Sequence, residues 1–249
     1  MAEKIVQQTD ARPCIIVDGV SKRFLKRNTH SFKEALVGWI KGKKVRADSF
    51  LALDDLSFQV GQGESVAVMG LNGSGKSTTL KMLSGVLEPD AGRVFTRGRV
   101  AGLIEVGAGF HPDLSGRENV YLNAAILGMS KNEIDERFDE IVAFSEIGDF
   151  IDQEVKHYSS GMFMRLAFSV AIHVELDILL VDEVLSVGDA PFRAKCIAKI
   201  QELTARGVTM LVVSHSAGMI KDLCERGIVI KKGRKIYDGD IDGALELLK

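Results

Sequence analysis

Residues 70–78 read GLNGSGKST and directly follow the apolar run Ser65–Met69. Their spacing, G-x-x-x-x-G-K-[ST], is that of a phosphate-binding loop between a strand and a helix. In such a loop successive backbone N–H groups point at a polyanion, and the amino end of the helix adds its dipole. The stretch therefore predicts a site for a nucleoside triphosphate, in preference to a glycine-rich turn before an ordinary helix.

The residue types within this loop suit that role. Glycine allows positive φ and a close approach of the backbone to the phosphates. Lys76 can reach the outer phosphates, and the hydroxyl of Ser77 can bind Mg²⁺. The predicted nucleotide-binding set in the loop comprises Gly70, Asn72, Gly73, Ser74, Gly75, Lys76, Ser77 and Thr78.

A second apolar run, Ile178–Val181, ends in two adjacent carboxylates, Asp182 and Glu183. In phosphate-loop ATPases a strand of this kind lies beside the loop. We expect Asp182 to hold Mg²⁺, directly or through water, and Glu183 to polarise an attacking water. An acidic turn after a core strand is the alternative, and the neighbouring phosphate loop disfavours it.

A third run, Met210–Val213, ends in Ser214 and His215. Because parallel strands end at one edge of a sheet, His215 is expected at the same edge as Asp182. A lone histidine after a strand is more often a structural residue than a catalytic one. Its place as a third polar group at a strand end favours contact with the γ-phosphate.

The pattern of apolar segments predicts an α/β fold. Short runs separated by helical stretches indicate right-handed crossovers and a parallel sheet. Apolar residues at helical spacing indicate a helical subdomain at residues 110–175, inserted into a core of residues 14–105 and 176–240. The expected parallel strands are Ser65–Met69, Ile178–Val181, Met210–Val213 and Ile228–Ile230, with Ile15–Val17, Leu51–Val60 and Arg93–Val100 in a small antiparallel layer.

Composition narrows the class of protein. The 249 residues, 46% hydrophobic and 27% charged, suit one globular unit, and a net charge of −2 argues against a general nucleic-acid binder. The three scattered cysteines, Cys14, Cys196 and Cys224, indicate neither a disulfide framework nor a zinc site and favour a reducing cytosol. The chain has no signal-peptide core and no apolar window of about 18 residues. If a membrane is involved, we expect another chain to cross it.

Residues 22–46 hold nine Lys or Arg residues and one acidic residue, Glu34, so the local net charge is +8. Phe32, Leu36, Trp39 and Ile40 fall on one helical face within it. We interpret residues 25–50 as a basic amphipathic insert that contacts a partner or lipid headgroups. A surface helix whose apolar stripe packs on its own core remains the alternative.

Residues 158–162, YSSGM, begin a predicted helix about twenty residues before Asp182. With the phosphate loop and the Asp-Glu pair, they make the chain resemble the nucleotide-binding subunit of an ABC transporter, with YSSGM in place of the LSGGQ signature. The resemblance implies a single ABC-type domain over residues 1–249 that hydrolyses ATP. It also implies a head-to-tail homodimer, in which Ser159, Ser160 and Gly161 contact ATP bound by the other subunit.

The same resemblance implies three further site residues. Phe24 matches the aromatic residue that stacks on adenine, although tyrosine is commoner there. Asp189 matches the loop that crosses the dimer after the catalytic carboxylate. Glu105 is nearest to the family's glutamine between core and helical insertion, and its carboxylate could reach Mg²⁺.

Three stretches together, LIEVGAGFHPDLSGRENVYLNAAILG, YSSGM and VDEVLSVGD, resemble the ABC ATPases that export polyprenyl-linked polysaccharides. This implies a peripheral protein on the cytoplasmic side of the plasma membrane, bound to a polytopic permease and acting indirectly on a lipid-linked glycan. Because the chain ends at Lys249 without a further domain, we do not expect it to select the glycan. A non-transport ABC ATPase, a mechanical module of the cell-division type, remains the alternative.

Overall fold

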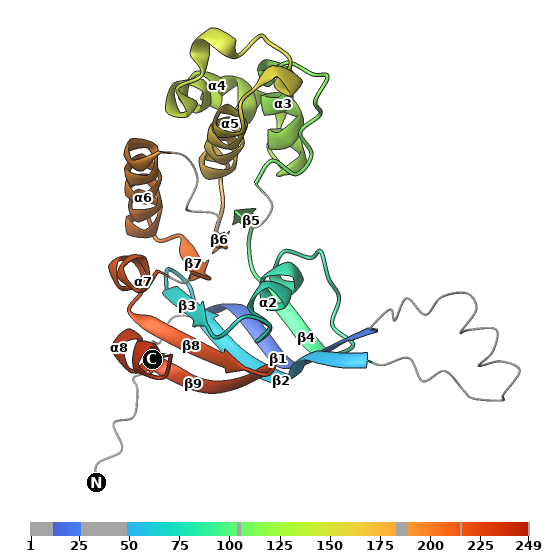
Figure 1. The fold of residues 1–249 in the computed structure, drawn as a ribbon, viewed down its shortest axis with the longest axis vertical. Helices are drawn as coiled ribbons and strands as arrows, with labels where there is room; N and C mark the ends of the chain where they lie inside the picture. Colours follow the sequence, from blue (N-terminus) through green and yellow to red (C-terminus); the bar gives the residue numbers. More distant parts are fainter. Residues whose placement is uncertain (1–11, 26–48, 104–105, 183–188, 215, 249) are drawn as a thin grey trace, which may run out of the picture.

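The computed structural model describes residues 12–25, 49–103, 106–182, 189–214 and 216–248, which form two sheets and a separate group of helices (Figure 1). The smaller sheet is antiparallel, in the order β2-β1-β4. Its strands are β1 (Pro13–Leu25), β2 (Ser49–Gly61) and β4 (Ala91–Thr96). The predicted antiparallel layer is confirmed, but its third strand ends at Thr96, and Val100 belongs to the other sheet.

The larger sheet has the order β5-β6-β7-β3-β8-β9 and is parallel except for β9, which runs antiparallel to β8. All four predicted core strands lie in it. The sequence did not reveal β5 and β9. In the observed order β7 lies between β6, which precedes Asp182, and β3, which precedes the phosphate loop. The strands are β3 (Ser65–Met69), β5 (Val100–Leu103), β6 (Ile178–Val181), β7 (Thr209–Val212), β8 (Arg226–Lys231) and β9 (Arg234–Asp240).

Both faces of the parallel sheet are buried, which explains why its strands read as continuous apolar runs. Along β3, Val66 and Val68 face a core shared with α2 (Lys76–Leu83) and the antiparallel sheet. Ala67 and Met69 face the opposite core, built with the helices after β5. That second core includes side chains from α5 (Ser160–His173), α6 (Ala190–Ala205), α7 (Ala217–Leu223) and α8 (Ile241–Glu246).

The separate helical group comprises α3 (Gly116–Ile126), α4 (Lys131–Ser145) and α5, with short 3₁₀ turns at Gly148–Phe150 and Val155–His157. Ser115 and Ser130 begin α3 and α4 with reciprocal capping boxes, which satisfy N–H groups at both helix starts. The group has its own apolar core and lies at the opposite end of the molecule from the antiparallel sheet (Figure 1). These helices occupy the range predicted for the helical subdomain.

No helix in the described part of the chain combines the length and apolar character needed to cross a bilayer. Most of the predicted basic insert lies outside the described residues, but Leu25, Ser49 and Phe50 belong to β1 and β2, so the strands include both ends of its predicted range. Three predicted site residues, Glu105, Glu183 and His215, also lie outside the described residues.

Candidate nucleotide-binding site

The loop of residues 70–75 leaves β3 at the carboxyl edge of the parallel sheet and enters α2 at Lys76. Two of its positions require glycine. At Gly70, with φ 150°, a Cβ would lie 2.2 Å from the carbonyl oxygen of Ile230 on β8. At Gly75, with φ 114°, a Cβ would lie 2.5 Å from Cδ2 of Leu53 on β2. The same Cβ would lie 2.8 Å from the carbonyl oxygen of Ala52, so backbone atoms of β8 and β2 leave no space for a side chain at these two positions.

Hydrogen bonds fix the loop further. The backbone N–H of Ser74 donates to Leu71 O (3.1 Å), and Gly233 N, in the turn between β8 and β9, donates to Ser74 O (2.9 Å). The buried side chain of Lys76 folds over the loop, where its Nζ donates to Gly70 O (2.8 Å) and Leu71 O (3.3 Å). The loop is therefore ordered by the chain itself.

The start of α2 has the chemistry of an anion site. Its N-cap is Gly75, so no side chain caps the first turn, whose N–H groups have no acceptor within the helix. Within the described part of the chain, the hydroxyl of Ser74 is buried without a hydrogen-bond partner. Backbone N–H groups at the start of a helix, the hydroxyl of Ser74 and the Lys76 ammonium form a donor set that suits phosphate oxygens.

Two oxygen-bearing side chains lie at the same sheet edge. Ser77 is exposed in the first turn of α2, and Asp182 is half-buried directly after β6. Val213 N donates to Val181 O (2.7 Å), which joins the ends of β6 and β7 where Asp182 and Ser214 follow. A hydroxyl and a carboxylate are ligands that Mg²⁺ accepts.

The predicted signature residues begin α5, in the helical group. Ser159 is the N-cap, and its hydroxyl accepts from Met162 N (3.2 Å). Ser159 and Ser160 are exposed, and a Cβ at Gly161 would meet only Ser159 Oγ, at 3.8 Å. Because α5 and α2 lie in different parts of the molecule, one chain does not bring the signature to its own phosphate loop (Figure 1).

Phe24 lies near the end of β1, opposite Phe50 of β2, and their rings stack with centroids 6.2 Å apart and planes at 22°. Phe50 is two residues before Ala52, whose carbonyl oxygen lies 2.8 Å from a Cβ built on Gly75. Phe50 therefore lies in the strand that borders the phosphate loop, with Phe24 beside it on β1. Sequence reasoning proposed Phe24 as a site residue but did not consider Phe50, because only the strand register shows that the two rings are partners.

Asp189 is the N-cap of α6, where its carboxylate accepts from Phe192 N (3.2 Å). The same carboxylate accepts from Arg165 Nη2 of α5 (2.9 Å). Sequence reasoning singled out Asp189 but not Arg165. Within the described residues, Asp189 thus connects α6 to the helix that carries the signature.

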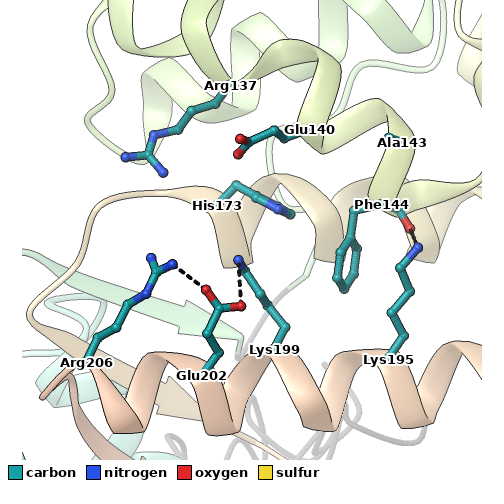
Figure 2. Close-up of a pocket in the computed structure, with 9 residues that line it drawn as sticks. All are labelled: Arg137, Glu140, Ala143, Phe144, His173, Lys195, Lys199, Glu202 and Arg206. Carbon is teal, nitrogen blue, oxygen red and sulfur yellow. Dashed lines mark hydrogen bonds and ion pairs between the residues drawn. The ribbon is translucent and has the colours of Figure 1, made fainter.

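A polar cavity of about 620 Å³ lies between α4, the end of α5 and α6, and none of its lining residues belongs to the phosphate loop (Figure 2). Lys199 and Arg206 both pair with Glu202 across its α6 side. His173 is buried against it with Nδ1 2.7 Å from Ser169 O, and burial lowers the pKa of this imidazole. The charges of this cavity are therefore largely satisfied within the protein.

A family model described as ABC transporter matches residues 53–186, which include the phosphate loop, the helical group and Asp182. An O-antigen export system ATP-binding protein, RfbB of Klebsiella pneumoniae, is 49% identical over 210 residues, covering 84% of this chain and 83% of the relative. A teichoic acids export ATP-binding protein, TagH of Listeria monocytogenes serotype 4b (strain F2365), is 44% identical over 200 residues, covering 80% of this chain and 59% of that relative.

Among solved structures, the dimeric ATP-binding cassette MJ0796 in a post-hydrolysis state with ADP and Pi superposes with a TM-score of 0.71 at 22% identity, covering 91% of this chain and 98% of that one. This likeness confirms the predicted α/β phosphate-loop fold. The family match covers more than half of the chain, and the similarity to RfbB extends over most of both proteins. This chain belongs to the ABC transporter family, as an ATP-binding subunit that hydrolyses ATP.

Proposed function

We propose that this ATPase powers export of a polyprenyl-linked polysaccharide across the cytoplasmic membrane, through a polytopic permease to which it binds from the cytoplasmic side. The observation that carries the proposal is the 49% identity, over 83% of its length, to a protein named for O-antigen export. A second relative, named for teichoic acid export, points to the same chemical class of cargo. Neither relative is named for a mechanical role.

In this proposal the loop of residues 70–78 binds the triphosphate and Lys76 neutralises the outer phosphates. Ser77 and Asp182 would hold Mg²⁺, with Glu105 as a further candidate ligand. Bound Mg²⁺ would neutralise charge that develops on the phosphate oxygens. Glu183 accepts a proton from the attacking water, and the imidazole of His215 contacts the γ-phosphate.

The signature would act in a head-to-tail homodimer. Ser160 is exposed and Gly161 presents no side chain, so a phosphate of the partner subunit's ATP can approach the amino end of α5. The dimeric state of a cassette with the same fold supports this arrangement. Asp189, at the start of α6, would lie in the loop that crosses between the subunits.

Closure of the dimer must be transmitted to the permease, and α3 offers a surface for that contact. Leu122 and Ile126 on this helix are exposed apolar side chains. Ile126 also lies against Gly109, where a Cβ would be 2.7 Å from Ile126 Cδ1. This surface therefore borders the stretch that connects the core to the helical group.

The test is purification of the tagged chain from its native membrane in mild detergent, beside a Lys76→Ala variant as control. We expect a polytopic protein to co-purify with both forms, and only the unmodified complex to hydrolyse ATP, at a rate raised by lipid-linked glycan. Co-purification of only soluble or single-pass proteins would refute the export proposal and favour a mechanical ATPase.

A further inference from the structure

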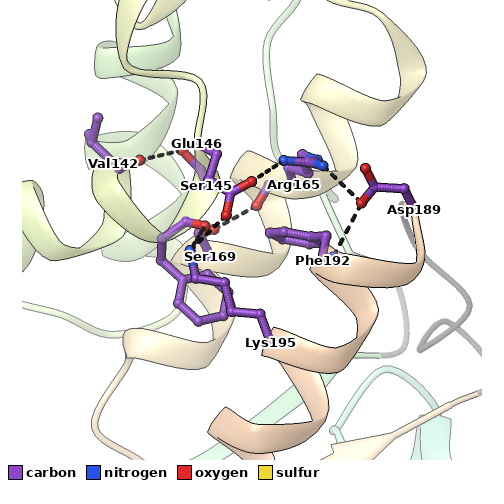
Figure 3. A network of polar contacts seen from close by, with 9 residues as sticks. Val142, Ser145, Glu146, Arg165, Ser169, Asp189, Phe192 and Lys195 are labelled. Carbon is purple, nitrogen blue, oxygen red and sulfur yellow. Dashed lines mark hydrogen bonds and ion pairs between the residues drawn. The ribbon is translucent and has the colours of Figure 1, made fainter.

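Arg165 of α5 contacts two other helices, α4 and α6, through one planar guanidinium (Figure 3). Its Nη1 donates to Glu146 Oε2 (2.6 Å) at the C-cap of α4. Its Nη2 donates to Asp189 Oδ1 (2.9 Å) at the N-cap of α6. Its Cζ lies 4.7 Å from the ring centroid of Phe192, one turn into α6. Because the guanidinium is rigid, these contacts fix direction as well as distance.

A second cation supports this arrangement from α6. Lys195 Nζ donates to Glu146 Oε1 (3.0 Å) and to Phe144 O (3.0 Å) near the end of α4. Lys195 and Arg165 hold the pKa of the Glu146 carboxyl below its usual value. Glu146 itself has positive φ, 59°, at the end of α4. The carboxyl end of α4 and the first turns of α6 thus meet the middle of α5 at one cluster, formed by Glu146, Arg165, Asp189, Phe192 and Lys195.

The position of Arg165 along α5 gives this cluster its significance. Arg165 is six residues after Ser159, or about 9 Å along the helix axis. The amino end of α5 carries the signature, whereas Asp189 directly follows the segment that contains Glu183. Exposed ion pairs contribute little to stability, but the side chain of Arg165 is only 20% exposed and joins two parts of the molecule.

We propose that Arg165 is a positioning residue that sets the signature end of α5 relative to Asp189, so that dimer closure and the arrangement of the catalytic carboxylate are coupled. This inference rests on the proposed role of Ser159–Gly161 in the dimer. The contacts of Arg165 are with Glu146, Asp189 and Phe192, none of which belongs to the phosphate loop. Its loss therefore lowers turnover while leaving ATP binding to the phosphate loop unchanged.

The test is Arg165→Ala in the full chain, with Arg117→Ala as the matched control. Arg117 also makes an ion pair, to Asp152 (2.7 Å), and its Cζ also lies 4.7 Å from a phenylalanine ring centroid, that of Phe138. Both of these contacts lie within the helical group. We expect Arg165→Ala to lower kcat at least tenfold, with the Kd for ATP within twofold of the unmodified protein and a melting temperature close to that of Arg117→Ala.

Two further variants distinguish coupling from stability. Asp189→Asn keeps an N-cap but loses the ion pair, so it should reproduce the kcat loss, and combining it with Arg165→Ala should add little. Arg165→Lys cannot hold both carboxylates in the same geometry and should restore kcat only partly. Full activity in Arg165→Ala, or additive losses in the double variant, would overturn the inference.

The turnover of a Gly161→Ala variant distinguishes a failure of this inference from a failure of the proposed function. If Gly161→Ala loses turnover while Arg165→Ala keeps it, the signature role stands and the coupling role fails. If neither variant changes turnover, the proposed dimer contact itself is wrong.

Discussion

Gly161→Ala should stabilise this protein and at the same time lower its ATPase activity. A Cβ at this position would meet only Ser159 Oγ, at 3.8 Å, an ordinary van der Waals distance. Gly161 is the second residue of α5, where alanine is favoured over glycine by up to about 1 kcal/mol. For a chain of this size, that gain raises the melting temperature by about 2–4 °C.

The same methyl group should reduce hydrolysis, because it would lie between the amino end of α5 and the phosphate expected from the partner subunit. A displacement of about 1 Å at a reacting group costs on the order of 10²-fold in rate. We therefore expect kcat to fall by about 10²-fold, measured as steady-state phosphate release at saturating ATP.

Gly218→Ala provides the control for this experiment. Gly218 is the second residue of α7, follows a serine N-cap as Gly161 does, and has nothing within 4 Å of a built Cβ. It should show a similar gain in melting temperature with unchanged kcat. Unchanged turnover in Gly161→Ala would refute the proposed phosphate contact. A lower melting temperature would contradict the conclusion that a Cβ fits at Gly161 without a clash.

Three further outcomes are expected. Phe24→Ala should weaken binding of ATP but not of inorganic triphosphate, whereas Phe95→Ala, an exposed phenylalanine elsewhere in the same sheet, should change neither affinity. The Glu183→Gln variant should still bind ATP, but its turnover should be slower by about 10²-fold or more. A single-turnover rate equal to that of the unmodified protein would exclude Glu183 as the base. Burial lowers the pKa of His173, so protonation disfavours the folded state. The free energy of unfolding should be fully retained above pH 6.5 and fall as the pH drops from 6.5 toward the lowered pKa, and urea titrations of His173→Gln should lack this loss.

The phosphate loop and its flanking strand and helix could be predicted because the glycines are required locally: at Gly70 and Gly75 the backbone has positive φ and no space for a side chain. The central strands could be predicted because burial on both faces leaves uninterrupted apolar runs. β9 could not, because it is an edge strand whose residues from Arg234 to Tyr237 are exposed or half-buried, and it shows no such run.

The order of the strands in the larger sheet could not be predicted from the sequence either, because apolar runs do not show which strand lies between β3 and β6. Contacts between side chains on different strands or helices could not be predicted from the sequence either. Phe50 and Arg165 become notable only when strand register and helix packing bring them to Phe24 and Asp189.

Leu25, the last residue of β1, pairs with Ser49, the first residue of β2. The chain leaves β1 and returns to β2 at directly opposed residues, so whatever connects them begins and ends at neighbouring points of the antiparallel sheet. The entropy of closing a flexible connection grows only slowly with its length. Segments of different length and charge could therefore be grafted between these two residues while the cassette keeps its fold, which makes this hairpin a natural place for related ATPases to diversify.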